Sequence, residues 1–152
     1  MSDNPTFTPH IVVSNAAAAI DFCKAAFGAE ELARHVAPNS NKIMHASLKI
    51  NGGVLMLNDD FSENMGGGTR QTPDALGGCP VTFHLEVPDA DAAWAKAVSA
   101  GAIVKMPLAN QFWGARYGML TDPFGFNWSI AQTIATPTPA EIEEGAKAAF
   151  AH

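Results

Sequence analysis

Four side chains in this chain have the types and the spacing for acid–base or metal chemistry. His10 and His84 lie 74 positions apart, and each begins a run of alternating apolar residues, while His45 and Glu86 lie in similar runs. An imidazole acts as a general base near neutral pH, and together with a carboxylate it can bind Zn²⁺, Fe²⁺ or Ni²⁺. Two alternatives follow: a catalytic base at His45 or His84, or a divalent-metal site made by His10, His84 and Glu86.

Other side chains could bind a ligand without altering it. Trp113 and Tyr117 can stack on a ring, and Arg116 can hold a carboxylate or a phosphate. The alternative for Arg116, and the one we favour, is an ion pair with Asp122 that braces the following turn. The predicted ligand-binding residues are His10, Met56, Trp113, Arg116, Tyr117 and Ser129.

An internal repeat indicates how these residues are positioned. The segment 8–16 (TPHIVVSNA) matches 82–90 (TFHLEVPDA), and each is followed by an alanine-rich stretch that ends at Gly-Ala. A third correspondence, of 51–57 with 124–130, has the same offset to within one residue. Three matches in the same order predict two copies of one supersecondary unit. The alternative is chance similarity between two capped, alanine-rich helices.

Each copy of the repeat predicts the order βαβββ. The expected strands and helices are 8–13, 16–27, 32–37, 43–50 and 54–58, then 81–87, 90–100, 103–106, 116–121 and 126–131. Asn15 and Asp89 are the expected helix N-caps, and Gly28 and Gly101 the expected stops. The fold class that this order predicts is α+β, with curved sheets whose mixed face could line a cavity.

The expected domain organisation is one domain over residues 1–135. It contains modules at about 7–58 and 80–132, joined by a loop at 59–79 that could serve as a lid, a partner arm or a disordered linker. Residues 136–152 form a linker and a short C-terminal helix. Thr138 and Glu141 fit a capping box at the start of that helix.

Strand alternation separates an apolar face from a mixed face. The apolar face should pack on the helices; it contains Ile11, Val13, Met44, Ala46, Leu48, Ile50, Leu55, Leu57, Val81, Phe83, Leu85, Val87, Trp128 and Ile130. On the helices, Ile20, Phe27, Trp94, Ala97 and Val98 should face inward. The mixed face contains the histidines, Met56 and Ser129, which favours a ligand-facing surface. The alternative is a sheet face that is simply exposed to solvent.

Composition and charge exclude several classes of partner. Hydrophobic residues make up 47% of 152 residues, and 9 basic against 15 acidic residues give a net charge of −6. Such a chain repels a phosphate backbone, so we expect no nucleic acid. No apolar stretch approaches the roughly 18–20 residues of a membrane span, so we expect no membrane. Residues 1–9 lack the pattern of a secretory signal, and two cysteines make no disulfide framework, so the expected location is cytoplasmic.

Several segments resemble the vicinal-oxygen-chelate superfamily, which includes glyoxalase I, bleomycin-resistance proteins and extradiol dioxygenases. They are AIDFCKAAFGA (19–29), MHASL (44–48), GVLMLND (53–59) and WGARYGMLTDPFGFNW (113–128), and they are most similar to the PhnB-like branch. The resemblance implies two βαβββ modules whose sheets curl around a central cavity. It also implies a homodimer.

The resemblance bears on metal binding as well. Metal-dependent members hold the ion with His, Gln or Glu on the first and last strands of each module. The corresponding residues here are Thr8, Met56, Thr82 and Ser129. A thioether and neutral hydroxyls are poor ligands for hard or borderline divalent ions. We therefore expect no metal at the standard site and no other cofactor, with the displaced set His10, His84 and Glu86 as the alternative.

Two functions remain after these arguments. The first is a metal-free protein that binds a small hydrophobic or aromatic molecule, similar to bleomycin-resistance proteins. The second is an enzyme of the same superfamily, a lyase, isomerase or dioxygenase, that uses the displaced metal or a histidine base. A module that binds a protein partner, with no pocket chemistry, is a third alternative.

Overall fold

The computed structural model describes residues 5–64 and 69–151. The first module contains β1 (His10–Val13), α1 (Ala16–Phe27), β2 (Glu30–Val36), β3 (Ile43–Ile50) and β4 (Gly53–Asp59). The second contains β5 (Thr82–Glu86), α3 (Ala90–Ser99), β6 (Ile103–Asn110), β7 (Ala115–Thr121) and β8 (Asn127–Thr133). The predicted βαβββ repeat and α+β class are confirmed.

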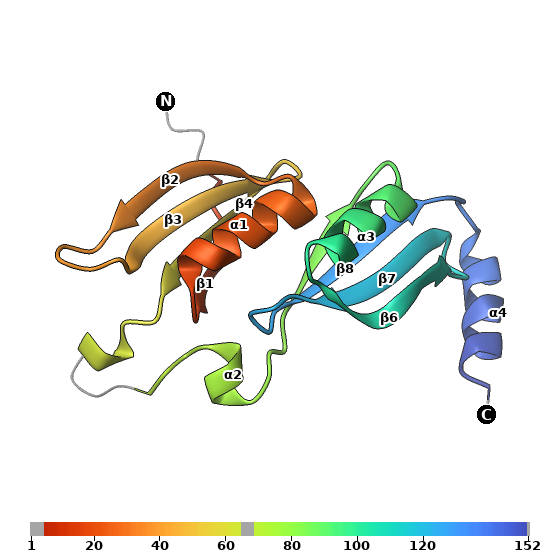
Figure 1. Ribbon diagram of the computed structural model, residues 1–152. Helices are drawn as coiled ribbons and strands as arrows, with labels where there is room; N and C mark the ends of the chain where they lie inside the picture. The colour runs from red at the N-terminus through yellow and green to blue at the C-terminus, as the bar shows by residue number, and fades with distance from the viewer. Residues whose placement is uncertain (1–4, 65–68, 152) are drawn as a thin grey trace.

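Each module forms a mixed four-stranded sheet. The strand orders are β1-β4-β3-β2 and β5-β8-β7-β6, with the first strand of each module parallel to the last and the other pairs antiparallel. The two sheets lie side by side (Figure 1). The last strand of each module is therefore central, and its residues have neighbours on both sides.

The helix boundaries follow from local capping. Asn15 and Asp89 each accept a hydrogen bond from the backbone N–H three residues on, at 3.1 Å, as predicted for N-caps. Gly28 has φ +66° and ends α1, where its N–H and that of Ala29 donate to the last carbonyls. A residue with a Cβ is disfavoured in that left-handed conformation.

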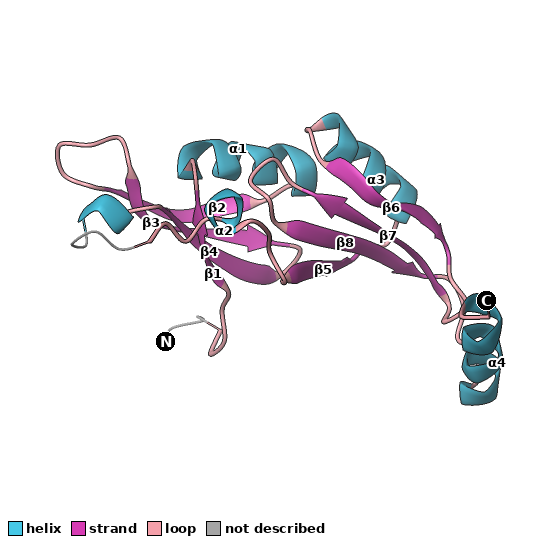
Figure 2. Cartoon of the chain, turned by 90° about the horizontal axis from the view of Figure 1, so that it is seen from below, coloured by secondary structure: helices cyan, strands magenta, loops and turns pink. Residues whose placement is uncertain are grey.

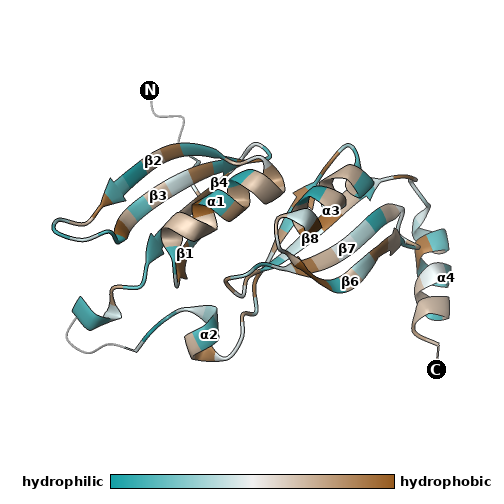
Figure 3. Cartoon of the chain, viewed as in Figure 1, coloured by the Kyte–Doolittle hydropathy of each residue, from teal (hydrophilic) through white to brown (hydrophobic). Residues whose placement is uncertain are grey.

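The long helices α1 and α3 cover the same face of the two sheets (Figure 2). α1 packs against α3, and one cluster of buried residues continues across the two modules. Rings join the modules: the centroids of Phe27 and Trp128 lie 4.3 Å apart, and those of Phe22 and Phe124 lie 6.3 Å apart. Polar and apolar residues are mixed along the strands (Figure 3), and the face opposite the helices contains the histidines.

Three residues predicted to be buried are exposed. Met44 is 47% exposed, and Ile43, at 1%, takes the core position instead. The reason is a bulge: His35 pairs with His45 but Val36 pairs with Ile43, so the alternation of β3 breaks there. Val81 precedes the first ladder pair of β5, and Val98 lies on the outer side of α3; both are exposed.

The connection between the modules has structure that we did not predict. It contains a short 3₁₀ turn, η1 (Ser62–Asn64), and a one-turn helix, α2 (Pro73–Leu76). Pro73 is buried, and a Cβ on Gly125 would lie 2.7 Å from its side chain, so α2 packs closely on the β7–β8 turn. The glycine run 66–68 falls outside the described residues.

The C-terminal helix α4 (Pro139–Ala149) begins with the predicted capping box of Thr138 and Glu141. It extends from the end of the second module (Figure 1) and contacts that module at Phe112. A Cβ on Gly145 would lie 2.6 Å from Phe112, which explains a glycine inside a helix at this position. Among the described residues, no helix combines the length and the apolar character that a bilayer crossing requires.

Candidate functional site

The strand register places His10 and His84 at equivalent positions in the two modules. His10 is the register partner of Met56 on β4, and His84 is the register partner of Ser129 on β8. Met56 and Ser129 are the standard metal positions of the last strands. Each histidine therefore lies beside a residue that would be a metal ligand in metal-dependent members of the superfamily that the sequence resembles.

His84 is held by two hydrogen bonds on the second sheet. Its Nδ1 lies 2.7 Å from Ser129 Oγ, and its Nε2 lies 2.7 Å from Glu86 Oε1. An ionised carboxylate only accepts, so Nε2–H donates to Glu86, and in the neutral ring Nδ1 accepts from the Ser129 hydroxyl. Glu86 thus fixes the tautomer of the ring. Ser129 is 1% exposed and lies on β8, the strand between β5 and β7.

The first sheet carries a row of three imidazoles. His10 Nε2 lies 2.7 Å from Asn58 Oδ1, and the rings of His10 and His45 meet edge to face with centroids 5.6 Å apart. His35 stacks beside His45 at 6.2 Å. Sequence reasoning missed His35, because only the pairing of β2 with β3 brings it opposite His45.

The second sheet has a similar row of rings. His84 stacks on Tyr117 with centroids 6.1 Å apart, and Tyr117 meets Trp113 at 5.5 Å. In each module a ring from the first strand therefore reaches a ring from the third strand across the central strand. Both rows lie on the face opposite the helices, so the structure brings together the predicted residues within each module.

Arg116, unlike the other predicted ligand-binding residues, points toward the helix-covered face. Its guanidinium donates to both carboxylate oxygens of Asp91 on α3, and also to Asn110. The favoured prediction of an ion pair with Asp122 is wrong. Asp122 instead accepts from Trp128 Nε1 and from backbone N–H groups of its own turn. Arg116 lies on the helix-covered face, one residue from Tyr117 on the other face, and its binding role stays a prediction.

The four standard metal positions do not fit a divalent ion. Thr8, Met56, Thr82 and Ser129 supply neutral hydroxyls and a thioether, and Ser129 Oγ is already bonded to His84. The described part of the chain also holds no group of three or more His, Cys, Asp or Glu arranged for a metal ion. The three residues of the displaced metal set do not all meet. His84 contacts Glu86 in the second module, whereas His10 contacts Asn58 in the first module.

A groove of about 830 Å³ opens on the same face of the first sheet. Its walls come from three segments: the N-terminal residues before β1, strand β2, and the β3–β4 hairpin. The lining residues are Pro5, Phe7, Pro9, Leu32, Ala33, Ser47, Lys49, Gly52, Gly53, Val54 and Met56. Its volume falls in the range of small-molecule sites, roughly 300–1,000 Å³. Of the predicted ligand-binding residues, only Met56 lines it.

Two titratable groups inside the fold are perturbed by burial. Burial raises the pKa of the Cys23 thiol to about 12, and the nearby Asp122 carboxylate adds to the rise. Burial also raises the pKa of Asp122, and it outweighs the opposing hydrogen bonds from Trp128 and the turn backbone. Both groups lie where the two modules meet, on the side of the helices. They belong to the core and not to the candidate site.

Two βαβββ modules with polar and aromatic residues on the uncovered sheet face define a class of two-module α+β proteins. The family model of the Glyoxalase/Bleomycin resistance protein/Dioxygenase superfamily matches residues 6–130, and the chain belongs to this family. An uncharacterized protein of Mycobacterium bovis is 49% identical over 139 residues, covering 91% of this chain and 90% of that protein.

Solved structures agree with this assignment. A gene product of Arabidopsis thaliana is 31% identical with a TM-score of 0.65, covering 84% of this chain and 98% of that one. A PhnB protein from Bacillus cereus has a TM-score of 0.64 at 18% identity, covering 84% and 99%. At that identity the second comparison establishes the shared fold alone.

Proposed function

We propose that this protein binds a small, ring-containing organic molecule on the uncovered face of its sheets, as bleomycin-resistance-like members of the family do, and releases it unchanged. The groove of about 830 Å³ on the first sheet carries the proposal. Its walls include Phe7, Leu32, Val54 and Met56. Covering these apolar side chains with a ligand is favourable because it removes apolar surface from water. The ring rows on the uncovered face of the two sheets offer further stacking surfaces.

A thermal-shift screen of aromatic and hydrophobic compounds tests the proposal. Hits are confirmed by equilibrium dialysis, followed by mass spectrometry of the recovered compound. We expect saturable 1:1 binding, a compound of unchanged mass, and weaker binding to Met56→Asp than to Met44→Asp. Met44 is the matched control because it is exposed and does not line the groove. A chemically altered compound would contradict simple binding and favour the second candidate.

The second candidate is an enzyme that uses His84 as a general base. The observation that favours it is the pair of 2.7 Å contacts, because Glu86 orients the ring and would stabilise the imidazolium. Nδ1 is the nitrogen that would accept the proton, and Ser129 Oγ lies 2.7 Å from it. His45, the other predicted base, has ring neighbours on both sides. Full retention of a discovered activity in the His45→Ala and His84→Ala variants would end this candidate.

A second copy of the chain is the proposed protein partner. The uncovered face exposes large apolar groups, with Phe7 at 88%, Leu32 at 49% and Trp113 at 39%, and a partner would cover them. Multi-angle light scattering tests this: we expect about twice the monomer mass of 16.0 kDa. A monomer at micromolar concentration would contradict it. The cytoplasmic location stays a prediction, supported by the free thiols of Cys23 and Cys79.

A further inference from the structure

We infer that the groove on the first sheet selects organic anions: molecules with an apolar, ring-containing body and one carboxylate, sulfonate or phosphate group, which Lys49 binds. The inference rests on the proposed function and adds to it the charge of the ligand. It assigns a role to a lysine that the sequence analysis placed on the mixed face without a function.

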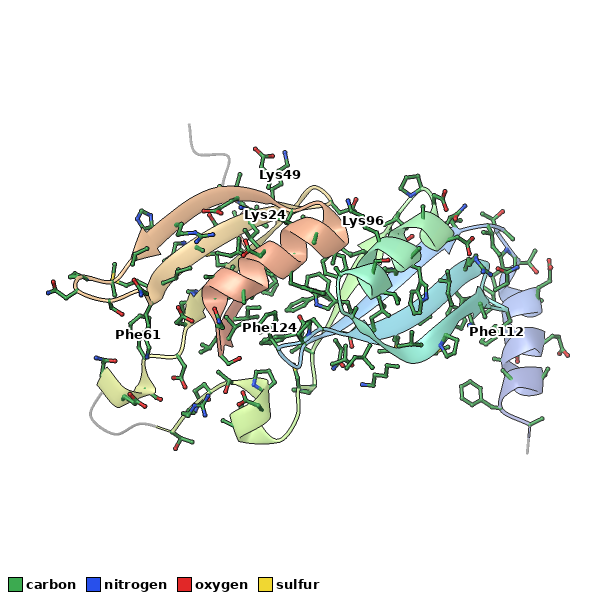
Figure 4. All side chains as sticks on the ribbon, viewed as in Figure 1. Lys24, Lys49, Phe61, Lys96, Phe112 and Phe124 are labelled. Carbon is green, nitrogen blue, oxygen red and sulfur yellow. The ribbon has the colours of Figure 1, made fainter. Side chains whose placement is uncertain are left out.

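Lys49 is the cationic residue of the groove lining. It lies near the end of β3, beside Val54 of β4 in the strand register, and it shares the uncovered face with Ser47. In Figure 4 its side chain extends beyond the ribbon at the end of the sheet, away from α1. An ammonium group on this flexible stem can reach over the apolar wall toward a bound molecule.

Within the described residues the ammonium of Lys49 forms no ion pair, although many other cations do. Lys24 and Arg34 bind Glu31, Arg116 binds Asp91, and the exposed Lys147 contacts Glu144. Glu30 is the register partner of Lys49 on β2, but the ion pairs of the described residues do not include these two. Glu30 does not line the groove. The lysine charge is thus free to meet a ligand anion.

The walls around Lys49 suit an apolar body. A small apolar recess of about 100 Å³ adjoins the groove through Pro9, Gly53 and Val54, which line both. Phe83, Leu85 and Trp128 of the second module also line this recess. A ligand whose rings enter the recess would leave its charged group over the hairpin, where Lys49 begins.

The groove lining and the second sheet differ in charge, and this difference favours the groove as the site of an anion. The second sheet presents the Glu86 carboxylate beside His84, whereas the described residues that line the groove include no carboxylate. The whole chain carries a net charge of −6, so its overall field repels anions. Binding of an anion therefore requires a local cation, and Lys49 supplies it.

Two dyes that differ by one charged group test the inference. Anilinonaphthalene sulfonate is an aromatic anion, and N-phenyl-naphthylamine is the same ring system without the sulfonate. Both are titrated by fluorescence into the wild-type protein, Lys49→Met and Lys105→Met. Lys105 is the matched control, because it lies in the other module and contacts Asn127.

We expect Lys49→Met to weaken binding of the sulfonate dye by about twofold to fivefold, the range for a partly exposed charge pair. The neutral dye should bind that variant as well as it binds wild type, and Lys105→Met should change neither. Equal weakening of both dyes, or no weakening of either, overturns the role of Lys49 while leaving the proposed binding function intact. Failure of both dyes to bind wild type contradicts the proposed function itself. Circular dichroism confirms that each variant is folded.

Discussion

Asp59 and Gln132 occupy equivalent positions at the ends of the central strands, and each accepts a hydrogen bond from the first N–H of its module's helix. Asp59 Oδ1 accepts from Ala16 at 2.8 Å, and Gln132 Oε1 accepts from Ala90 at 2.9 Å. Asp59 also accepts from Ile43 at 2.7 Å through its second oxygen. One side chain thus ties the helix, the third strand and the last strand of the first module together.

Removing Asp59 should destabilise the fold more than removing Gln132. Asp59→Ala leaves two buried N–H groups without acceptors and removes a negative charge from a helix N-terminus, which we expect to cost about 2–4 kcal/mol. Gln132→Ala should cost about 1 kcal/mol, because it frees one donor. Urea unfolding followed by circular dichroism measures both. Equal losses would show that the second hydrogen bond of Asp59 contributes nothing.

Asp122 should make stability fall as pH rises. Burial raises the pKa of Asp122 in the folded state above the ordinary value of 3.8. Between pH 3.8 and the folded-state pKa, the folded protein therefore holds more protons than the unfolded chain. The contribution of Asp122 to stability is therefore largest below pH 3.8 and is lost as pH rises through the folded pKa.

Asp122→Asn tests this sign. The variant loses the titrating group, so the unfolding free energy of the variant minus that of wild type should increase from pH 4 upward, whatever the absolute stability of the variant. Urea denaturation at several pH values gives the difference. A difference that stays flat, or falls, with pH contradicts the raised pKa.

The two cysteines should differ in reactivity. Cys23 is 5% exposed with a pKa of about 12, so at pH 8 it is a protonated, covered thiol. Cys79 lies half-buried before β5, with its Sγ 3.8 Å from the Val81 carbonyl. Ellman's reagent should modify one thiol in the native protein and two in urea. The Cys79→Ser variant should give none and one; rapid labelling of Cys23 in that folded variant would contradict its burial.

Gly118 should tolerate no side chain. It is buried on β7, and a Cβ there would lie 2.6 Å from Trp94 and 2.9 Å from the backbone of Leu108. Gly118→Ala should cost about 1–3 kcal/mol, the usual range for overpacking. Gly52→Ala supplies the contrast, since no atom lies within 4 Å of a Cβ at that position and only its φ of +86° opposes the change. Thermal unfolding compares the two.

The protein should retain no divalent metal above trace. This follows from the donor types at Thr8, Met56, Thr82 and Ser129. Untagged protein is incubated with Zn²⁺, Fe²⁺, Mn²⁺ or Ni²⁺, desalted, and measured by plasma mass spectrometry. Stoichiometric retention that is lost in His10→Ala or His84→Ala would establish the displaced site and place the enzyme first.

Local signals in the sequence determined much of the fold. The repeat predicted the two modules, and caps such as Asn15, Asp89 and Thr138 predicted where helices begin, because capping depends on residues a few positions apart. Alternation predicted the faces of the strands wherever pairing is regular. It failed at Met44, where a bulge shifts β3 against β2.

The sequence also determined the candidate residue types, but only the tertiary structure decided which of them meet. His84 finds Ser129 45 positions away, and His35 joins His45 through the register of β2 and β3. Arg116 binds Asp91 and not Asp122, since strand alternation and the packing of α3 bring that carboxylate to its face. Lys49 became a candidate only when three separate segments enclosed it in one groove. Such contacts depend on pairing between distant strands, which no local pattern specifies.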